Sequence, residues 1–148
     1  MMFPYSNTAK LANIIATAML MLHLSLSHAQ EGQLGQIRVI EVLADHDSRY
    51  KIAGLKQPEI NVKAGEQVVL RITAKKAKNM NREGAIHGFT LLRAHDQKAV
   101  EGWDFALQPG TQEFSVTAPS EPGEYIVVCT VICSDDHEGM KMKFVVSR

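Results

Sequence analysis

Four side chains that bind soft metal ions lie within twelve residues near the C-terminus. Cys129, Cys133, His137 and Met140 have the spacing C-x3-C-x3-H-x2-M. Thiolate and thioether sulfurs are soft ligands, and imidazole suits copper and zinc. No other window of the sequence concentrates such atoms in this way. The spacing therefore predicts a metal-binding loop, and the soft ligand set favours copper.

Other chemistries explain this window less well. A structural zinc site would not use Met140, and a Cys–His nucleophile pair would lack a third orienting group and leave the second cysteine unexplained. A disulfide between Cys129 and Cys133 is the ordinary expectation in an exported chain. It would close a small ring with little entropic gain, and the spacing of His137 and Met140 would then be a coincidence. We interpret these residues as metal ligands and do not expect an enzyme.

The N-terminus is typical of a targeting segment. An apolar run over residues 11–26 follows Lys10 and ends in small residues up to Ala29, the pattern of a cleavable secretory signal peptide. An uncleaved membrane anchor is the alternative, but the run is short for a span and contains polar residues. We expect residues 1–29 to be removed. Residues 30–148 would then form an exported domain, periplasmic in a bacterium, with no membrane span.

Composition limits the class of this domain. The 148-residue chain is 45% hydrophobic and 22% charged, as in one ordinary globular domain. Lys plus Arg and Asp plus Glu both total 16, so no basic excess favours a nucleic acid, and no motif for binding one is present. We therefore expect no nucleic acid as a partner, and the charge says little else about what the protein binds.

Short apolar runs that alternate with polar residues predict β-strands, and glycine, proline and aspartate separate them as turn formers. We expect residues 75–84, which are polar and basic, to form a surface loop. Several short strands with such turns favour an all-β sandwich. The expected strands cover residues 37–43, 68–73, 114–116, 125–131 and 142–146.

These strands would bring the ligands to one end of the sandwich. The strand over residues 125–131 would deliver Cys129 there, and the loop after it would carry the other ligands of the window. His87 directly precedes another apolar segment and could reach the same end from a neighbouring strand. By contrast, His46 and His95 lie among aspartates and are interpreted as solvated loop residues.

A distant histidine followed by C-x3-C-x3-H-x2-M resembles the binuclear CuA domain of cytochrome c oxidase subunit II and of nitrous-oxide reductase. Residues 58–66, 86–89 and 122–125 are also similar to cupredoxin segments. The resemblance covers roughly the whole mature chain, but its specific content is confined to the loop and His87. It implies a cupredoxin-like Greek-key β-sandwich that carries copper.

The resemblance also implies a role for each ligand. Both cysteines would bridge two coppers as thiolates, and each of two histidines would bind one copper. A thioether would be a weak axial ligand, and a backbone carbonyl would complete the set. A rigid β scaffold suits a centre that shares one electron between two coppers. The implied ligands are His87, Cys129, Val131, Cys133, His137 and Met140.

Two positions depart from the resemblance. Val131 occupies the place where oxidase subunits typically have glutamate, and Ser134 replaces the usual glycine after the second cysteine. The first departure argues against docking as an ordinary oxidase subunit. The implied function is single-electron transfer to or from a redox protein such as a c-type cytochrome or a terminal reductase or oxidase.

Three alternatives remain open at this point. The protein could be a periplasmic copper chaperone that delivers copper to an acceptor protein. Met142, which follows Met140 at strand period, could be the thioether ligand instead. A mononuclear type 1 copper carrier would need fewer ligands: His87, Cys133, His137 and Met140.

Overall fold

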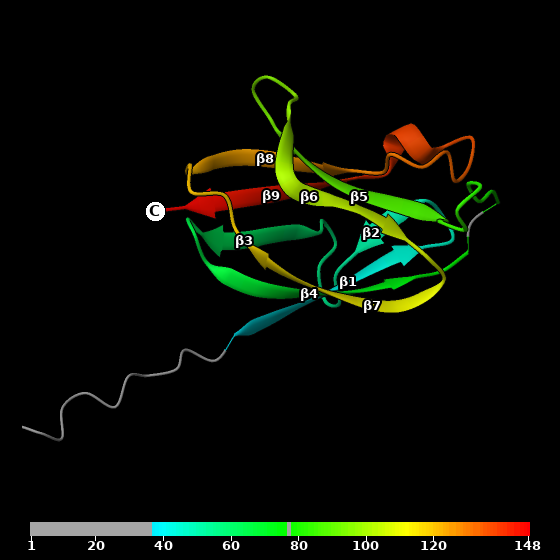
Figure 1. Cartoon of the computed structure of the whole chain (residues 1–148), viewed down its shortest axis with the longest axis horizontal. Coiled ribbons are helices and arrows are strands. Elements are labelled where there is room, and N and C mark those ends of the chain that lie inside the picture. Colours follow the sequence, from blue (N-terminus) through cyan, green and yellow to red (C-terminus); the bar gives the residue numbers. More distant parts are fainter. Residues whose placement is uncertain (1–36, 77) are drawn as a thin grey trace, which may run out of the picture. The chain divides into compact units, whose positions relative to one another are not determined.

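The computed structural model describes residues 37–76 and 78–148, which fold into two β-sheets packed face to face (Figure 1). The predicted signal peptide, residues 1–29, lies outside the described residues, as do residues 30–36 of the predicted domain. The elements in chain order are β1 (Arg38–Asp45), β2 (Arg49–Lys51), β3 (Glu59–Lys63), β4 (Gln67–Ala74), β5 (His87–Arg93), β6 (Ala99–Leu107), β7 (Gly110–Thr117), β8 (Gly123–Val128), the short 3-10 helix η1 (His137–Gly139) and β9 (Lys141–Ser147).

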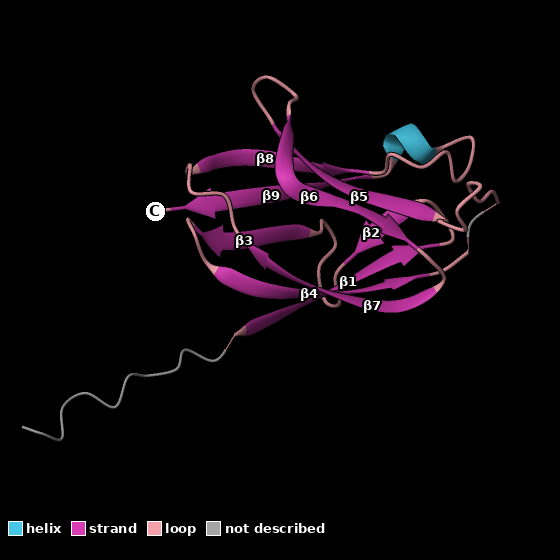
Figure 2. Ribbon diagram, viewed as in Figure 1, coloured by secondary structure: helices cyan, strands magenta, loops and turns pink. Residues whose placement is uncertain are grey.

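One sheet has the strand order β2-β1-β4-β7, and the other has the order β3-β9-β8-β5-β6. Figure 2 shows that strands make up most of the described chain, with η1 lying in the loop between β8 and β9. Within the described residues, no helix has both the length and the apolar character needed to cross a membrane.

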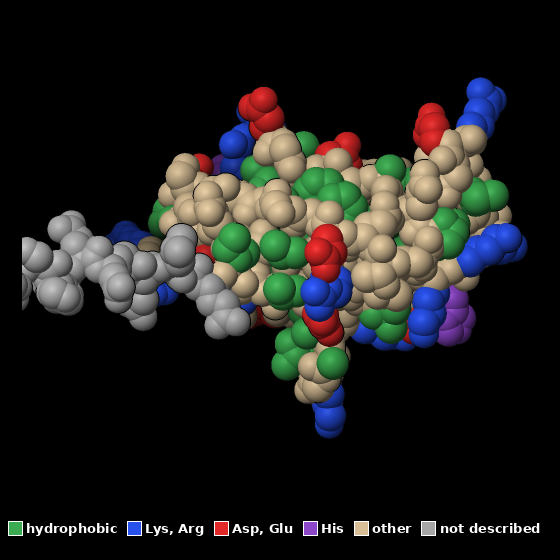
Figure 3. Space-filling model, turned by 60° about the horizontal axis from the view of Figure 1, so that its bottom comes forward, with side chains coloured by type: hydrophobic (Ala, Val, Ile, Leu, Met, Phe, Trp, Pro, Cys, Tyr) green, Lys and Arg blue, Asp and Glu red, His purple; other side chains and the backbone are tan. Residues whose placement is uncertain are grey.

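Strand β4 illustrates why these sequences form a sandwich. Val68, Leu70 and Ile72 are almost fully buried, whereas Val69 and Arg71, which lie between them, are only partly buried. This alternation buries one face of the sheet and leaves the other to solvent. On the face seen in Figure 3, acidic and basic side chains lie next to one another. The strand predicted over residues 68–73 is therefore confirmed.

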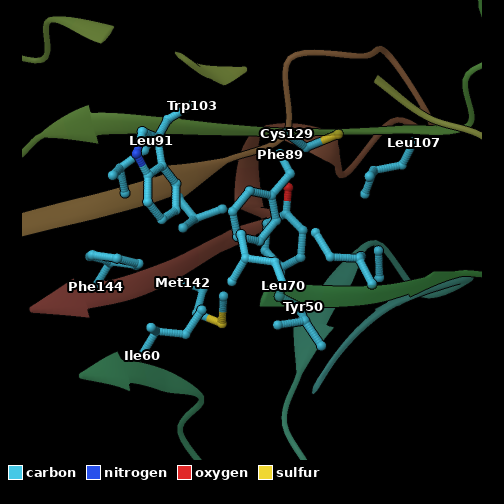
Figure 4. Close-up of a cluster of buried hydrophobic side chains, with 14 of the residues drawn as sticks. Tyr50, Ile60, Leu70, Phe89, Leu91, Trp103, Leu107, Cys129, Met142 and Phe144 are labelled. Carbon is cyan, nitrogen blue, oxygen red and sulfur yellow. The ribbon is translucent and has the colours of Figure 1, made fainter. Parts of the chain in front are cut away.

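The core between the sheets is built from aliphatic and aromatic side chains (Figure 4). Trp103 packs edge-on against Phe144, with their ring centroids 5.2 Å apart, and Tyr50 packs against Phe89 in the same way at 5.5 Å. Such contacts add to the apolar area that each ring buries. Cys129 lies at the margin of this cluster, so the predicted metal loop rests directly on the core.

The antiparallel pairing of β5, β8 and β9 decides where the loop lies. Val128, the last residue of β8, pairs with Thr90 of β5 and with Lys141, the first residue of β9. The end of β8 therefore meets the beginnings of both neighbours at one end of the sandwich. The strand predicted to reach Val131 stops earlier, because the pairing of β8 with β5 and β9 ends at Val128, and the chain bends at Val131.

Candidate metal centre

Three residues from separate parts of the chain meet at this end of the sandwich. One ring nitrogen of His87 and the sulfurs of Cys129 and Cys133 all lie within 4.8 Å of one another. All three side chains are buried. His87 opens β5, Cys129 follows the end of β8, and Cys133 lies in the loop. The structure thus brings together three of the six residues whose types and order suggested a metal site.

His87 presents one ring nitrogen that makes no hydrogen bond. Its Nε2 lies 2.9 Å from the carbonyl oxygen of Lys75, and because a carbonyl only accepts, Nε2 carries the hydrogen and Nδ1 the lone pair. Among the described residues, Nδ1 is the one buried side-chain nitrogen or oxygen without a partner. Leaving such an atom unpaired costs about 1–3 kcal/mol. A bound metal ion would remove that cost.

The environment of His87 keeps its ring neutral. Burial lowers the pKa of His87, and the hydrogen bond to Lys75 and the charge of Asp45 oppose that shift only in part. A charged ring is poorly solvated in the interior, so the neutral form is favoured there. Neutral imidazole is the form that binds a metal.

The two thiols lie close to each other without being bonded. Their sulfurs are 3.8 Å apart, well beyond the length of about 2.05 Å that a disulfide requires. Both cysteines are therefore free thiols in the structure. Burial raises the pKa of Cys129 to about 11, and the neighbouring Cys133 adds to that shift, whereas a hydrogen bond from the Gly88 N–H, 3.2 Å away, opposes it.

Backbone hydrogen bonds shape the loop around these sulfurs. The Cys129 N–H donates to the Met140 carbonyl at 3.2 Å, and the Cys133 N–H donates to the Val131 carbonyl at 2.7 Å. The Cys133 carbonyl in turn accepts from the Asn79 N–H at 2.8 Å. The Val131 carbonyl oxygen also lies 3.2 Å from the Cys129 sulfur. The backbone atom suggested as a ligand is thus close to the sulfur of Cys129.

Gly88 allows the loop to approach β5 this closely. A Cβ atom at this position would lie 2.5 Å from the Thr130 hydroxyl oxygen and 2.7 Å from the Thr130 backbone nitrogen. The Gly88 carbonyl accepts a hydrogen bond from the Tyr50 hydroxyl, which links it to the opposite sheet. Sequence reasoning missed this role, and a glycine directly after a suspected ligand was the only available signal.

The last two predicted side-chain ligands are His137, the first residue of η1, and Met140, which directly follows it. His137 is half-buried, and its Nδ1 lies 3.0 Å from the carbonyl oxygen of Ser134, which leaves Nε2 as the ligand atom. His137 is outside the 4.8 Å group described above. Met140 is fully buried directly before β9, and Met142 lies in β9 opposite Val127; both methionines belong to the buried core.

The remaining histidines of the described chain lie on the surface. The side chain of His46 is 69% exposed, and that of His95 is 70% exposed. His46 forms an ion pair with Asp45 and His95 one with Asp96 when protonated. Neither histidine belongs to the group of metal-binding atoms around His87. Both positions agree with their interpretation as solvated loop residues.

Comparison with known proteins identifies the architecture. Neither a protein family nor a curated protein matches the sequence. The structure is similar to auracyanin A, a "blue" copper protein from the green thermophilic photosynthetic bacterium Chloroflexus aurantiacus, with a TM-score of 0.53, 20% identity, and coverage of 76% of this chain and 100% of that one. Rusticyanin from Thiobacillus ferrooxidans aligns with a TM-score of 0.50 and 16% identity over 76% of this chain and 79% of its own. The fold is that of a cupredoxin.

The predicted cupredoxin-like Greek-key β-sandwich is thereby confirmed. At identities of 16% and 20%, the likeness establishes the cupredoxin fold alone. The chemistry of the site must be argued from the side chains themselves. In this cupredoxin fold, the cluster of His87, Cys129 and Cys133 lies where the ends of three strands and one loop converge.

Proposed function

We propose that the chain is an exported copper protein that transfers single electrons through a binuclear, CuA-like centre. The observation that carries this proposal is the pair of buried sulfurs 3.8 Å apart, next to an unpaired buried imidazole nitrogen. Two sulfurs and imidazole form a donor set that suits copper. The proposed ligands are His87, Cys129, Val131, Cys133, His137 and Met140.

The spacing of the sulfurs fits a bridged pair of ions. A metal–thiolate bond is about 2.3 Å long, and the distance of 3.8 Å between Cys129 Sγ and Cys133 Sγ is less than two such bonds. This separation would allow Cys129 and Cys133 to hold the same metal ions through both sulfurs. A mononuclear site at Cys133 would leave Cys129 buried beside it without a role.

The chain's own groups would hold the ligands in place. The Lys75 carbonyl selects the tautomer of His87, and the Ser134 carbonyl does the same for His137. The Gly88 N–H donates to the sulfur of Cys129. When bound, copper would supply one-electron redox chemistry, which a rigid sandwich favours because the ligands need little rearrangement.

Two exposed apolar side chains neighbour residues of the cluster. Ile132, between the two cysteines, is 69% exposed, and Met80 is 54% exposed in the loop whose Asn79 N–H binds the Cys133 carbonyl. Exposed side chains next to a buried site offer a short path for an electron to a docked protein. We expect that partner to be a c-type cytochrome or a terminal reductase or oxidase.

The number of coppers tests the proposal. After loading with both thiols reduced, the wild type should bind two coppers per chain, and the mixed-valence form should show paramagnetic hyperfine splitting from two nuclei. Cys129→Ser should abolish that splitting even if some copper stays bound at Cys133. One copper, splitting from a single nucleus and indifference to Cys129→Ser would refute the binuclear centre and favour the type 1 alternative.

A second experiment separates an electron carrier from a copper chaperone. A carrier should keep its copper in the presence of an apo acceptor protein or a modest chelator, and it should cycle reversibly between oxidation states. Ready loss of copper to the acceptor would instead favour delivery.

Export is tested by the mass of the secreted chain, which should begin near Gln30. Recovery only from membranes with residues 1–29 intact would contradict cleavage.

A further inference from the structure

A buried serine from a distant turn reaches the sulfur of Cys133. Ser48 lies between β1 and β2 and is 2% exposed. Its hydroxyl oxygen lies 3.7 Å from the Cys133 sulfur and 2.6 Å from the Ser134 hydroxyl oxygen. Burying a hydroxyl is unfavourable unless it is hydrogen-bonded. These two contacts therefore account for a polar side chain in the interior.

The backbone conformation of Ser48 is one that glycine would adopt more easily than serine. Its φ is 56°, in the left-handed region, where glycine avoids the steric cost that a Cβ incurs. The turn is closed by a hydrogen bond of 3.1 Å from the Ser48 N–H to the Asp45 carbonyl. Backbone geometry alone would thus favour glycine, and the hydroxyl is what serine adds.

The direction of the hydrogen bonds follows from their donors. The Ser134 hydroxyl oxygen accepts from the Asp136 N–H at 3.1 Å. If the Ser134 hydroxyl donates to the Ser48 oxygen, the hydrogen of Ser48 is left for the Cys133 sulfur. A thiolate only accepts, so in the metal-bound state this arrangement gives both hydroxyl hydrogens an acceptor. The three groups then form a relay that ends at one sulfur.

We propose that Ser48, oriented by Ser134, is a positioning residue that donates a hydrogen bond to the Cys133 thiolate and raises the reduction potential of the centre. This inference rests on the proposed copper function. A hydrogen bond withdraws electron density from a thiolate and stabilises the reduced, less positive centre. The two sulfurs would then have different donors, because Cys129 accepts from the backbone N–H of Gly88.

Ser48→Gly removes the hydroxyl while suiting the left-handed backbone. The variant should have a lower reduction potential than the wild type and a shifted thiolate-to-copper absorption band. Its affinity for Cu(I) in a chelator competition should fall by about 10-fold or more. Ser134→Ala interrupts the relay one step earlier and should change the potential in the same direction by less.

Gln97→Gly is the matched control, because Gln97 also has a left-handed φ of 58° but is exposed. It should change neither the potential nor the spectrum. A copper-loaded Ser48→Gly with the wild-type potential and spectrum would overturn the inference and leave the copper function intact. If Ser48→Gly fails to fold, an unchanged potential in Ser134→Ala has the same meaning. A wild type that binds no copper would overturn both proposals.

Discussion

Gly88 offers a direct test of how the loop and strand β5 fit together. In Gly88→Ala, the added Cβ would lie 2.7 Å from the Thr130 backbone nitrogen, whereas ordinary van der Waals contact begins at 3.4 Å. The loop must therefore move away from β5 by about 0.7 Å. Backbone cannot rotate aside as a flexible side chain can, so the contact is relieved only by shifting the loop.

The cost of this shift is set by overpacking in a buried region. Such substitutions destabilise by about 1–3 kcal/mol, or roughly 4–12 °C in Tm for a domain of this size. The same movement lengthens the 3.2 Å hydrogen bond from the Gly88 N–H to the Cys129 sulfur. We therefore expect Gly88→Ala to lose both stability and copper affinity.

Urea unfolding of the apo protein and chelator competition for Cu(I) measure the two effects. Gly123→Ala is the matched control, because a Cβ at Gly123 has no atom within 4 Å, and it should change neither quantity. Adding Thr130→Ala to Gly88→Ala removes the hydroxyl contact at 2.5 Å but not the backbone contact, so only part of the loss should be recovered. If Gly88→Ala is as stable as Gly123→Ala, the packing argument is wrong.

Three further predictions concern the ligands. His87→Ala and His137→Ala should each weaken copper binding and alter the visible spectrum, whereas His46→Ala and His95→Ala should not; equal damage from His95→Ala would mean that the ligand set is wrong. Burial lowers the pKa of His87 below its ordinary value of 6.5. As the pH falls, the His87 side chain is therefore protonated in the unfolded chain before it is protonated in the folded one. Urea titrations of the apo protein should show full stability above about pH 6.5 and a decline below it. In His87→Gln this part of the pH dependence should disappear, and an unchanged profile would assign it to another group. Burial raises the pKa of Cys129 to about 11, so copper uptake near neutral pH must displace the thiol proton. The affinity for copper should therefore rise with pH, and uptake should release protons into a weakly buffered solution. A copper affinity that does not change with pH would contradict a bridging role for Cys129.

Local pattern in the sequence was enough to predict much of the fold. Alternation at period two placed strands such as β4 and β9, since burying one face of a sheet requires that period. The predicted surface loop over residues 75–84 also lies between β4 and β5. The end of β8 was placed too late, because the nearly continuous apolar run extends to Val131, whereas pairing with β5 and β9 ends at Val128.

The sequence by itself determined which atoms are suited to a metal, because the chemistry of Cys129, Cys133 and His137 and their spacing can be read directly. His87 was added to this set by the resemblance to CuA domains, since its place before an apolar strand was weak evidence by itself. Only the tertiary structure decided that the His87 nitrogen and both sulfurs share one buried volume, since strand pairing brings residues about 40 positions apart into contact. The roles of Gly88 and Ser48 depend on distances across that packing, which leave no local pattern in the sequence.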